Sequence, residues 1–171
     1  MEADARFSAC RRYRYALWRR WAPGPQLLFI LLNPATADEY RDDPTIRRCL
    51  GFARAWGYGA LAVANLFARR TASAVELARL AARSPENLVG PDNDAWLLRL
   101  YRESERTVAA WGNQGRLLGR SRAVRTLAPA LHCLGWTRLG EPRHPLYLPA
   151  DTPHRPLGSP RLRPSPASSI G

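Results

Sequence analysis

Three short apolar segments, each leading into polar residues, divide the middle of the chain. They occupy residues 27–32, 60–66 and 107–111. Segments of this length that are apolar on both faces are typical of strands in the interior of a sheet. Asn33 follows the first segment, Asn65 lies near the end of the second, and Gly112 and Asn113 follow the third. The sequence therefore predicts three buried strands with polar residues at their carboxyl ends.

The segments around these strands repeat apolar residues at helical spacing, which predicts helices over residues 44–56, 73–83, 90–101 and 116–128. The first begins with Asp43 as N-cap and Pro44 as its first residue, and it ends at Gly57. Ser73 and Glu76 form a capping box for the second. Strands that alternate with helices predict an α/β fold, here a three-layer α/β/α sandwich with a mostly parallel sheet.

An arginine-rich segment, residues 11–21, precedes the first buried strand, and its polar and apolar residues alternate from Arg12 to Leu17. This alternation predicts an edge strand with one solvated face. The turn Pro23-Gly24-Pro25 then predicts a hairpin with residues 27–32, which places an N-terminal β-hairpin at the edge of the sheet. We interpret the arginines as a charged edge that discourages aggregation, with contact to nucleic acid as the alternative.

The remaining segments complete a single-domain organisation. Residues 1–9 are expected to form a loose lead-in, and residues 132–134 a short strand. One α/β domain is expected over residues 10–150. Residues 151–171 are rich in proline, arginine and serine, a composition that predicts a disordered tail.

Charge points to a polyanionic partner. The formal net charge is +12, and all 26 basic residues are arginine, which also reflects a coding bias. Nucleic acid or a nucleotide is the expected partner, and neither a membrane nor an obligate protein partner is inferred. Three widely spaced cysteines form no metal or disulfide pattern, and no apolar run reaches membrane-spanning length. We expect a cytoplasmic protein without cofactor or metal.

The carboxyl edge of a parallel sheet is where such folds bind ligands, so the predicted site lies at the strand ends. The helix start at Thr45, with Arg47 and Arg48 in its first turn, would suit an anion such as phosphate. Plain helix capping is the alternative for this segment. Asn33 and Asn65 have a similar alternative as residues that satisfy loop backbone.

Nearly the whole chain resembles a family of bacterial and phage proteins grouped as domain of unknown function 1643. The segments that carry this resemblance are LLNPATAD, DDPTIRRCLGFARAWGYG, VANLFARR, VGPDND, AAWGNQG and PRHPLYL. The family name implies no chemistry.

A second, more distant resemblance is to uracil-DNA glycosylase-like proteins, in which short motifs close successive strands. Four segments resemble these motifs in the same order: Leu32-Asn33-Pro34, Val63-Ala64-Asn65, Ala110-Trp111-Gly112 and His144-Pro145. The sequence departs from the family pattern in having Ala35 for a glycine and Leu146 for a serine after His-Pro. The resemblance implies a uracil-DNA glycosylase-like fold and hydrolysis of an N-glycosidic bond.

The resemblance also implies roles for individual residues. His144 would stabilise the departing base, Asn33 would hold the attacking water, and Asn65 would read the base edge. The other residues expected to contact substrate are Pro34, Trp111, Gly112, Pro145 and Tyr147. Tyr40 and Tyr147 are both candidates for stacking on the base.

Two other classes of function stay open. One is a nucleic-acid or nucleotide-binding module on the same scaffold that lacks catalysis, favoured by the missing serine and the missing general base. The other is a metal-dependent nucleotide hydrolase that uses Asp38, Asp42, Asp43 and His144. Acidic residues this close in one short loop more often form a solvated turn.

Overall fold

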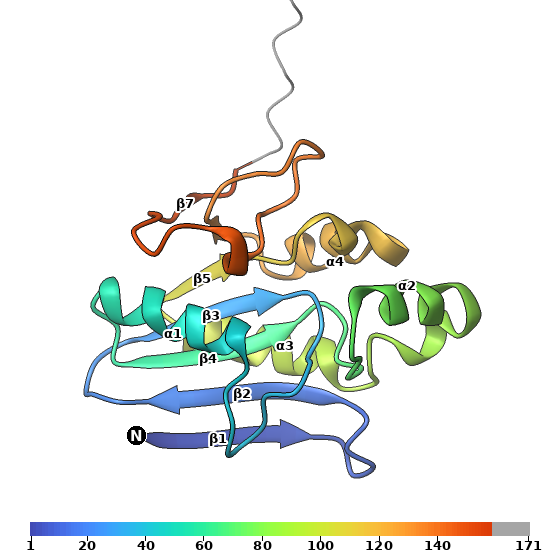
Figure 1. The fold of residues 1–171 in the computed structure, drawn as a ribbon, viewed down its shortest axis with the longest axis horizontal. Helices are drawn as coiled ribbons and strands as arrows, with labels where there is room; N and C mark the ends of the chain where they lie inside the picture. Colours follow the sequence, from blue (N-terminus) through green and yellow to red (C-terminus); the bar gives the residue numbers. More distant parts are fainter. Residues whose placement is uncertain (159–171) are drawn as a thin grey trace, which may run out of the picture.

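A seven-stranded sheet forms the centre of the computed structural model, which describes residues 1–158 (Figure 1). Its strands, in chain order, are β1 (Glu2–Phe7), β2 (Arg14–Arg20), β3 (Gln26–Leu31), β4 (Ala60–Asn65), β5 (Arg106–Ala109), β6 (His132–Cys133) and β7 (Arg155–Pro156). Their order across the sheet is β1-β2-β4-β3-β5-β6-β7. The four strands from β4 to β6 are parallel to one another, and antiparallel pairs flank them on both sides. The expected mixed α/β fold with a parallel centre is confirmed.

Four α-helices and three short 3-10 segments connect the strands. They are α1 (Pro44–Ala55), α2 (Ala74–Arg83), η1 (Pro85–Asn87), α3 (Asn93–Glu103), η2 (Asn113–Gly119), α4 (Arg120–Leu127) and η3 (Pro145–Tyr147). The capping signals act as expected, because Asp43 accepts a hydrogen bond from the Ile46 N–H and Ser73 accepts one from the Glu76 N–H. Gly57, with φ of 83°, follows the end of α1.

Two apolar clusters cover the two faces of the sheet. On one face, Leu27, Phe29 and Leu31 pack with Ile46 and Phe52 of α1. On the other face, side chains of β3 and β4 pack with residues of α2, α3 and α4, among them Leu77, Leu97, Leu100 and Val124. The sheet is therefore buried between α1 and the other three helices.

The predicted hairpin between residues 11–21 and 27–32 is wrong. β2 pairs with β1 and β4, whereas β3 lies between β4 and β5. Every residue of β3 after Gln26 is buried, so this strand occupies the centre of the sheet and not its second position. The connection from β2 to β3 passes over Gly59, whose N–H donates to the Pro25 carbonyl oxygen at 3.1 Å. A Cβ at Gly59 would lie 2.5 Å from the Ala22 carbonyl oxygen, so a side chain here would block this crossing.

The lead-in predicted for residues 1–9 is also wrong in part, since β1 pairs along β2 and forms the edge of the sheet. β2 is consequently an interior strand, and two of its arginines are buried, contrary to the interpretation as a solvated charged edge. Arg14 and Arg19 are each 2% exposed. The segment between β3 and α1 crosses in front of β2 (Figure 1) and supplies carbonyl acceptors to both side chains.

Two further boundaries differ from expectation. The helix expected over residues 116–128 starts at Arg120, because Leu117 and Leu118 have non-helical backbone angles. Gly115 packs against the indole of Trp111 in this region, where a Cβ would lie 2.1 Å from the ring. The start of the predicted tail belongs to the fold, since β7 pairs with β6 and Leu157 is buried. The rest of that predicted tail, residues 159–171, lies outside the described residues.

Within residues 1–158, no helix combines the length and the apolar composition that a membrane crossing requires.

Candidate functional site

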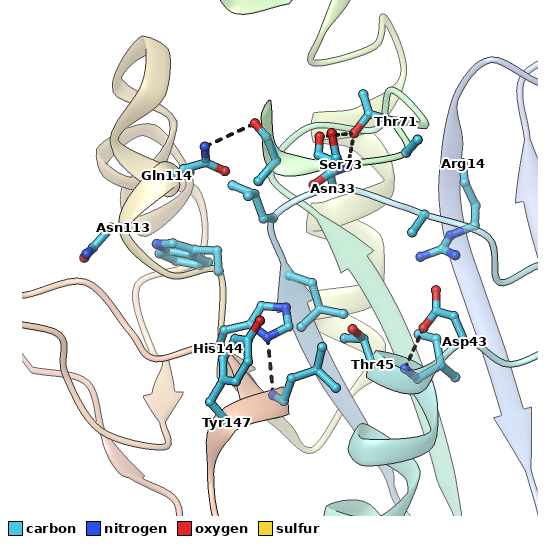
Figure 2. Close-up of a pocket in the computed structure, with 18 residues that line it drawn as sticks. Arg14, Asn33, Asp43, Thr45, Thr71, Ser73, Asn113, Gln114, His144 and Tyr147 are labelled. Atoms are coloured by element: carbon cyan, nitrogen blue, oxygen red, sulfur yellow. Dashed lines mark hydrogen bonds between the residues drawn. The ribbon is translucent and has the colours of Figure 1, made fainter. Parts of the chain in front are cut away.

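A cavity of about 520 Å³ lies at the carboxyl ends of the parallel strands. Its wall is built by the segments that follow β3, β4 and β5, by the start of α1 and by η3 with the residue before it. Figure 2 shows side chains from all these segments facing the same space. Of the residues selected from sequence, those in the wall are Asn33, Asp43, Thr45, Trp111, His144 and Tyr147. Side chains that are far apart in the sequence thus line one cavity at the strand ends.

Asn33 is held by its amide nitrogen. Its Nδ2 donates to the Thr71 hydroxyl and to the Pro34 carbonyl oxygen, the latter at 3.3 Å. No hydrogen bond to Oδ1 is found among the described residues, so this oxygen is available to accept one from a ligand or a water.

His144 is the N-cap of η3, and its ring is fixed by the backbone of that segment. The Leu146 N–H donates to Nδ1 at 3.3 Å, which places the proton of the neutral ring on Nε2. Figure 2 shows the second ring nitrogen turned away from η3 toward the cavity. Burial lowers the pKa of His144 below its ordinary value, and the charge of Asp43 opposes this shift. The ring is therefore neutral at pH 7 and presents an N–H donor.

The loop that carries His144 is anchored beneath the cavity by a buried carboxylate. Glu141 accepts hydrogen bonds from the Trp111 indole N–H and from the Ser121 hydroxyl, both at 2.7 Å. The Gly112 N–H donates to the Pro142 carbonyl oxygen at 2.8 Å. These bonds join the end of β5 to the loop, so the position of the imidazole depends on them.

Several residues expected to contact substrate do not form the wall of the cavity. Asn65 is 1% exposed, and its Oδ1 accepts a hydrogen bond from Arg14 at 3.4 Å. Pro34, Gly112 and Pro145 are likewise absent from the wall. Gly112 lies behind His144, since a Cβ at this position would be 4.0 Å from the His144 Cβ. These residues support the wall from outside.

Of the three residues expected to bind an anion, only Thr45 faces the cavity. Arg47 donates to the Asp42 carbonyl oxygen at 2.8 Å. Arg48 donates to the carbonyl oxygens of Pro145 and Leu148 and so joins α1 to η3. Both side chains donate to backbone carbonyl oxygens beside the cavity and do not form part of its wall.

Arg14 faces the cavity and was missed as a site residue, because its alternating neighbours resemble a solvated edge. β2 runs antiparallel to β4, with Leu17 opposite Val63, so its first residue lies at the carboxyl ends of the parallel strands. The guanidinium donates to the Ala37 carbonyl oxygen at 2.8 Å and to Asn65. Burial lowers the pKa of Arg14 to about 10, against the opposing effect of Asp43, and Arg14 stays charged at pH 7.

Asp43 also faces the cavity, and its carboxylate is used for capping. Its two oxygens accept from the Ile46 N–H at 2.9 Å and from the Ala37 N–H at 3.3 Å. Asp42 is paired with Arg19, and Asp38 accepts from backbone N–H groups of its own turn. Among residues 1–158, no three His, Cys, Asp or Glu side chains gather into a group that could hold a metal ion.

The sequence from residue 14 to residue 146 matches the family model described as "Protein of unknown function (DUF1643)". The chain belongs to this family. No curated protein and no solved structure matches the chain. The DUF1643 match begins at Arg14 and ends at Leu146, so it contains every residue of the cavity wall except Tyr147. The cavity is therefore a feature of the DUF1643 region itself.

Proposed function

We propose that this DUF1643 protein binds a base of a nucleotide or nucleic acid in the cavity and hydrolyses its N-glycosidic bond, as the resemblance to uracil-DNA glycosylase-like proteins implies. The observation that carries the proposal is that Asn33 and His144, far apart in the sequence, line the same cavity. A volume of about 520 Å³ is within the range of small-molecule sites.

His144 would stabilise the leaving base. In the reaction, the bond between the sugar C1′ and the base nitrogen breaks, and the base departs with the bonding electrons. The neutral imidazole would donate its Nε2–H to the base oxygen on which negative charge develops. The lowered pKa supports this role, since the ring needs no deprotonation to remain neutral near pH 7.

Asn33 would orient the water whose oxygen bonds to C1′. Its Nδ2 is occupied by Thr71 and Pro34, so Oδ1 would accept a hydrogen bond from that water. An amide does not take a proton at neutral pH, so the water's proton would pass to the departed base or to solvent.

Tyr147 and two carboxamides would contact the base. Tyr147 is 87% exposed, and its ring centroid lies 6.2 Å from that of His144 at the cavity mouth. Asn113 and Gln114 border the cavity where Asn65 does not, so they would replace Asn65 in reading the base edge.

The test uses single- and double-stranded oligonucleotides with uracil or another modified base at one position. Hot alkali cleaves the strand wherever a base has been lost. We expect abasic sites with the wild type and a rate reduced about 100-fold in His144→Gln and in Asn33→Ala. His154→Gln, which changes a histidine outside the cavity, should retain activity. Absence of abasic sites across the whole panel would overturn the catalytic proposal.

A non-catalytic binding module is the second candidate, and the buried position of Asn65 favours it. Asn65 is buried behind Arg14, to which it is hydrogen-bonded. The side chain of Asn33 is an amide, which can bind a ligand but cannot accept a proton at neutral pH. This candidate predicts salt-dependent binding of oligonucleotides that survives Asn33→Ala and His144→Ala.

A further inference from the structure

Arg14 is a buried cation whose hydrogen bonds are incomplete. Its side chain is 2% exposed and forms part of the cavity wall. Two carbonyl oxygens, those of Ala37 and of the Asn65 side chain, accept from its terminal nitrogens. Its Nε is buried and has no hydrogen-bond partner among the described residues. Behind it, the Nδ2 of Asn65 also lacks an acceptor.

The charge of Arg14 is not neutralised at close range. Within the part of the chain that the structure describes, the ion pairs with N–O distances up to 4.0 Å involve Arg11, Arg19, Arg99 and Arg120, but not Arg14. Asp43 is the nearest candidate in the cavity wall, and its oxygens accept backbone N–H groups. A buried cation without a close counter-ion is costly unless a ligand completes its environment.

Two helix N-termini add backbone N–H donors to the same wall. Thr45 is in the first turn of α1, and Ser73 and Ala74 form the start of α2. The hydrogen bonds of the described residues include no acceptor for the N–H of Thr45 or of Ala74. Helix N-termini favour anions through such N–H groups and through the helix dipole. Arg14 and both helix starts therefore present donors to one cavity.

We propose that Arg14, together with the N-termini of α1 and α2, binds a phosphate group of the ligand, so that the cavity takes a phosphorylated nucleotide and not a bare base or nucleoside. This inference rests on the proposed function, which supplies the base. Figure 2 shows Arg14 on one side of the cavity and His144 and Tyr147 on the other. The phosphate binds at the Arg14 side, and the base lies against His144 and Tyr147.

The experiment compares pairs of ligands that differ only in a phosphate. Calorimetry measures the affinity of the protein for deoxynucleoside 5′- and 3′-monophosphates, for the matching nucleosides and for inorganic phosphate. A charge-assisted hydrogen bond predicts that a monophosphate binds about 10-fold or more tightly than its nucleoside. Arg14→Gln should remove this difference, and Arg14→Lys should retain part of it. Arg20→Gln is the matched control, since Arg20 lies on the same strand and is exposed.

A second measurement uses the wild type, so that its outcome does not depend on the stability of Arg14→Gln. In the wild type, inorganic phosphate should shift the NMR signal of the Arg14 Nε–H, which is assigned by its absence in Arg14→Lys. A phosphate advantage that persists in folded Arg14→Gln would overturn the proposal, as would equal affinity for monophosphates and nucleosides. A protein that binds none of these probes at millimolar concentration would overturn it as well.

The two experiments distinguish failure of the proposed hydrolysis from failure of the proposed phosphate site. If no abasic sites form but the phosphate advantage depends on Arg14, the glycosidic chemistry fails and the phosphate site stands. If abasic sites form and the phosphate advantage does not depend on Arg14, the phosphate site fails and the chemistry stands.

Discussion

Arg14 and Arg19 lie on the same strand, are equally buried and hold the same segment between β3 and α1, yet their surroundings differ. Arg19 makes five hydrogen bonds, of which one is to the Asp42 carboxylate at 2.9 Å and four are to backbone carbonyl oxygens. Arg14 bonds to two oxygens, and its Nε has no partner among the described residues. The donors of the Arg19 guanidinium all have acceptors within the described residues, whereas those of Arg14 do not.

This difference assigns a structural role to Arg19 and is the basis of the binding role proposed for Arg14. A buried guanidinium whose donors are all hydrogen-bonded stabilises the fold, because each donor has a protein acceptor in place of the water that it binds in the unfolded chain. A buried guanidinium with a donor left over costs free energy in the absence of a ligand. Incomplete bonding at a cavity wall is therefore a better indicator of a binding site than burial or charge alone.

The largest expected effect is at Arg19. Arg19→Gln leaves Asp42 without its cation and several carbonyl oxygens without donors, which should lower the free energy of unfolding by about 3 kcal/mol. Urea denaturation followed by tryptophan fluorescence measures this. Arg20→Gln, an exposed change on the same strand, should shift it by less than about 0.5 kcal/mol. Similar stability of the two variants would remove the structural half of the comparison.

Glu141 extends the comparison to a buried acid, whose Oε2 accepts two side-chain hydrogen bonds. Glu141→Leu deprives the Trp111 N–H and the Ser121 hydroxyl of their acceptor, and a loss of about 2 kcal/mol in unfolding free energy is expected. Glu141→Gln keeps an acceptor oxygen and should lose less. The two variants are compared in the same urea titration. Equal losses would mean that the bond to Trp111 contributes little.

Arg14→Gln is expected to change the free energy of unfolding by less than about 1 kcal/mol, in contrast to Arg19→Gln. The loss of bonds to Ala37 and Asn65 is offset by removal of an incompletely bonded buried charge. The same urea titration, run without ligand, checks this. A loss as large as that at Arg19 would show that Arg14 is required for the fold.

The smallest effect is a pH dependence that neither arginine should alter. Burial is the main cause that lowers the pKa of His132, His144 and His154 below their ordinary values. The unfolded chain therefore takes up protons first, so stability is full above about pH 6.5 and falls as the pH drops through the folded-state pKa values. Denaturation midpoints at pH 8, 6.5 and 5 measure this fall. His154→Gln should reduce it, because the Nδ1 of His154 lies 2.8 Å from the Nδ1 of His132. A midpoint that rises on acidification would contradict the shifts.

Local signals predicted the parts of the fold that depend on neighbouring residues. α1 follows from Asp43, Pro44 and Gly57, and the start of α2 from Ser73 and Glu76. The buried strands were predicted from apolar segments, and the polar residues at their ends indicated the edge of the sheet where Asn33 and His144 line one cavity. These features depend on residues a few positions apart, which a sequence displays directly.

The pairing of β2 and the burial of Arg14 depend on segments far apart in the sequence. Nothing near Arg14 indicates that residues 37–43 fold over it, so alternation with arginines was interpreted as an exposed edge. Asn65 was misplaced for the same reason, because its contact with Arg14 is set by the pairing of β2 with β4. The orientation of β2 was nevertheless a usable signal, since an antiparallel strand starts where its parallel neighbours end.

Arg48 links α1 to the segment that carries His144. It joins α1, whose first turn contributes Thr45 to the cavity wall, to the carbonyl oxygens of Pro145, the first residue of η3, and of Leu148, the residue after η3. A displacement of α1 on contact with an anion would therefore be transmitted to the segment that aims the imidazole. If the proposed phosphate site and the proposed hydrolysis both hold, removing the phosphate from a ligand would lower turnover as well as affinity, because the alignment of His144 would depend on the contact at α1.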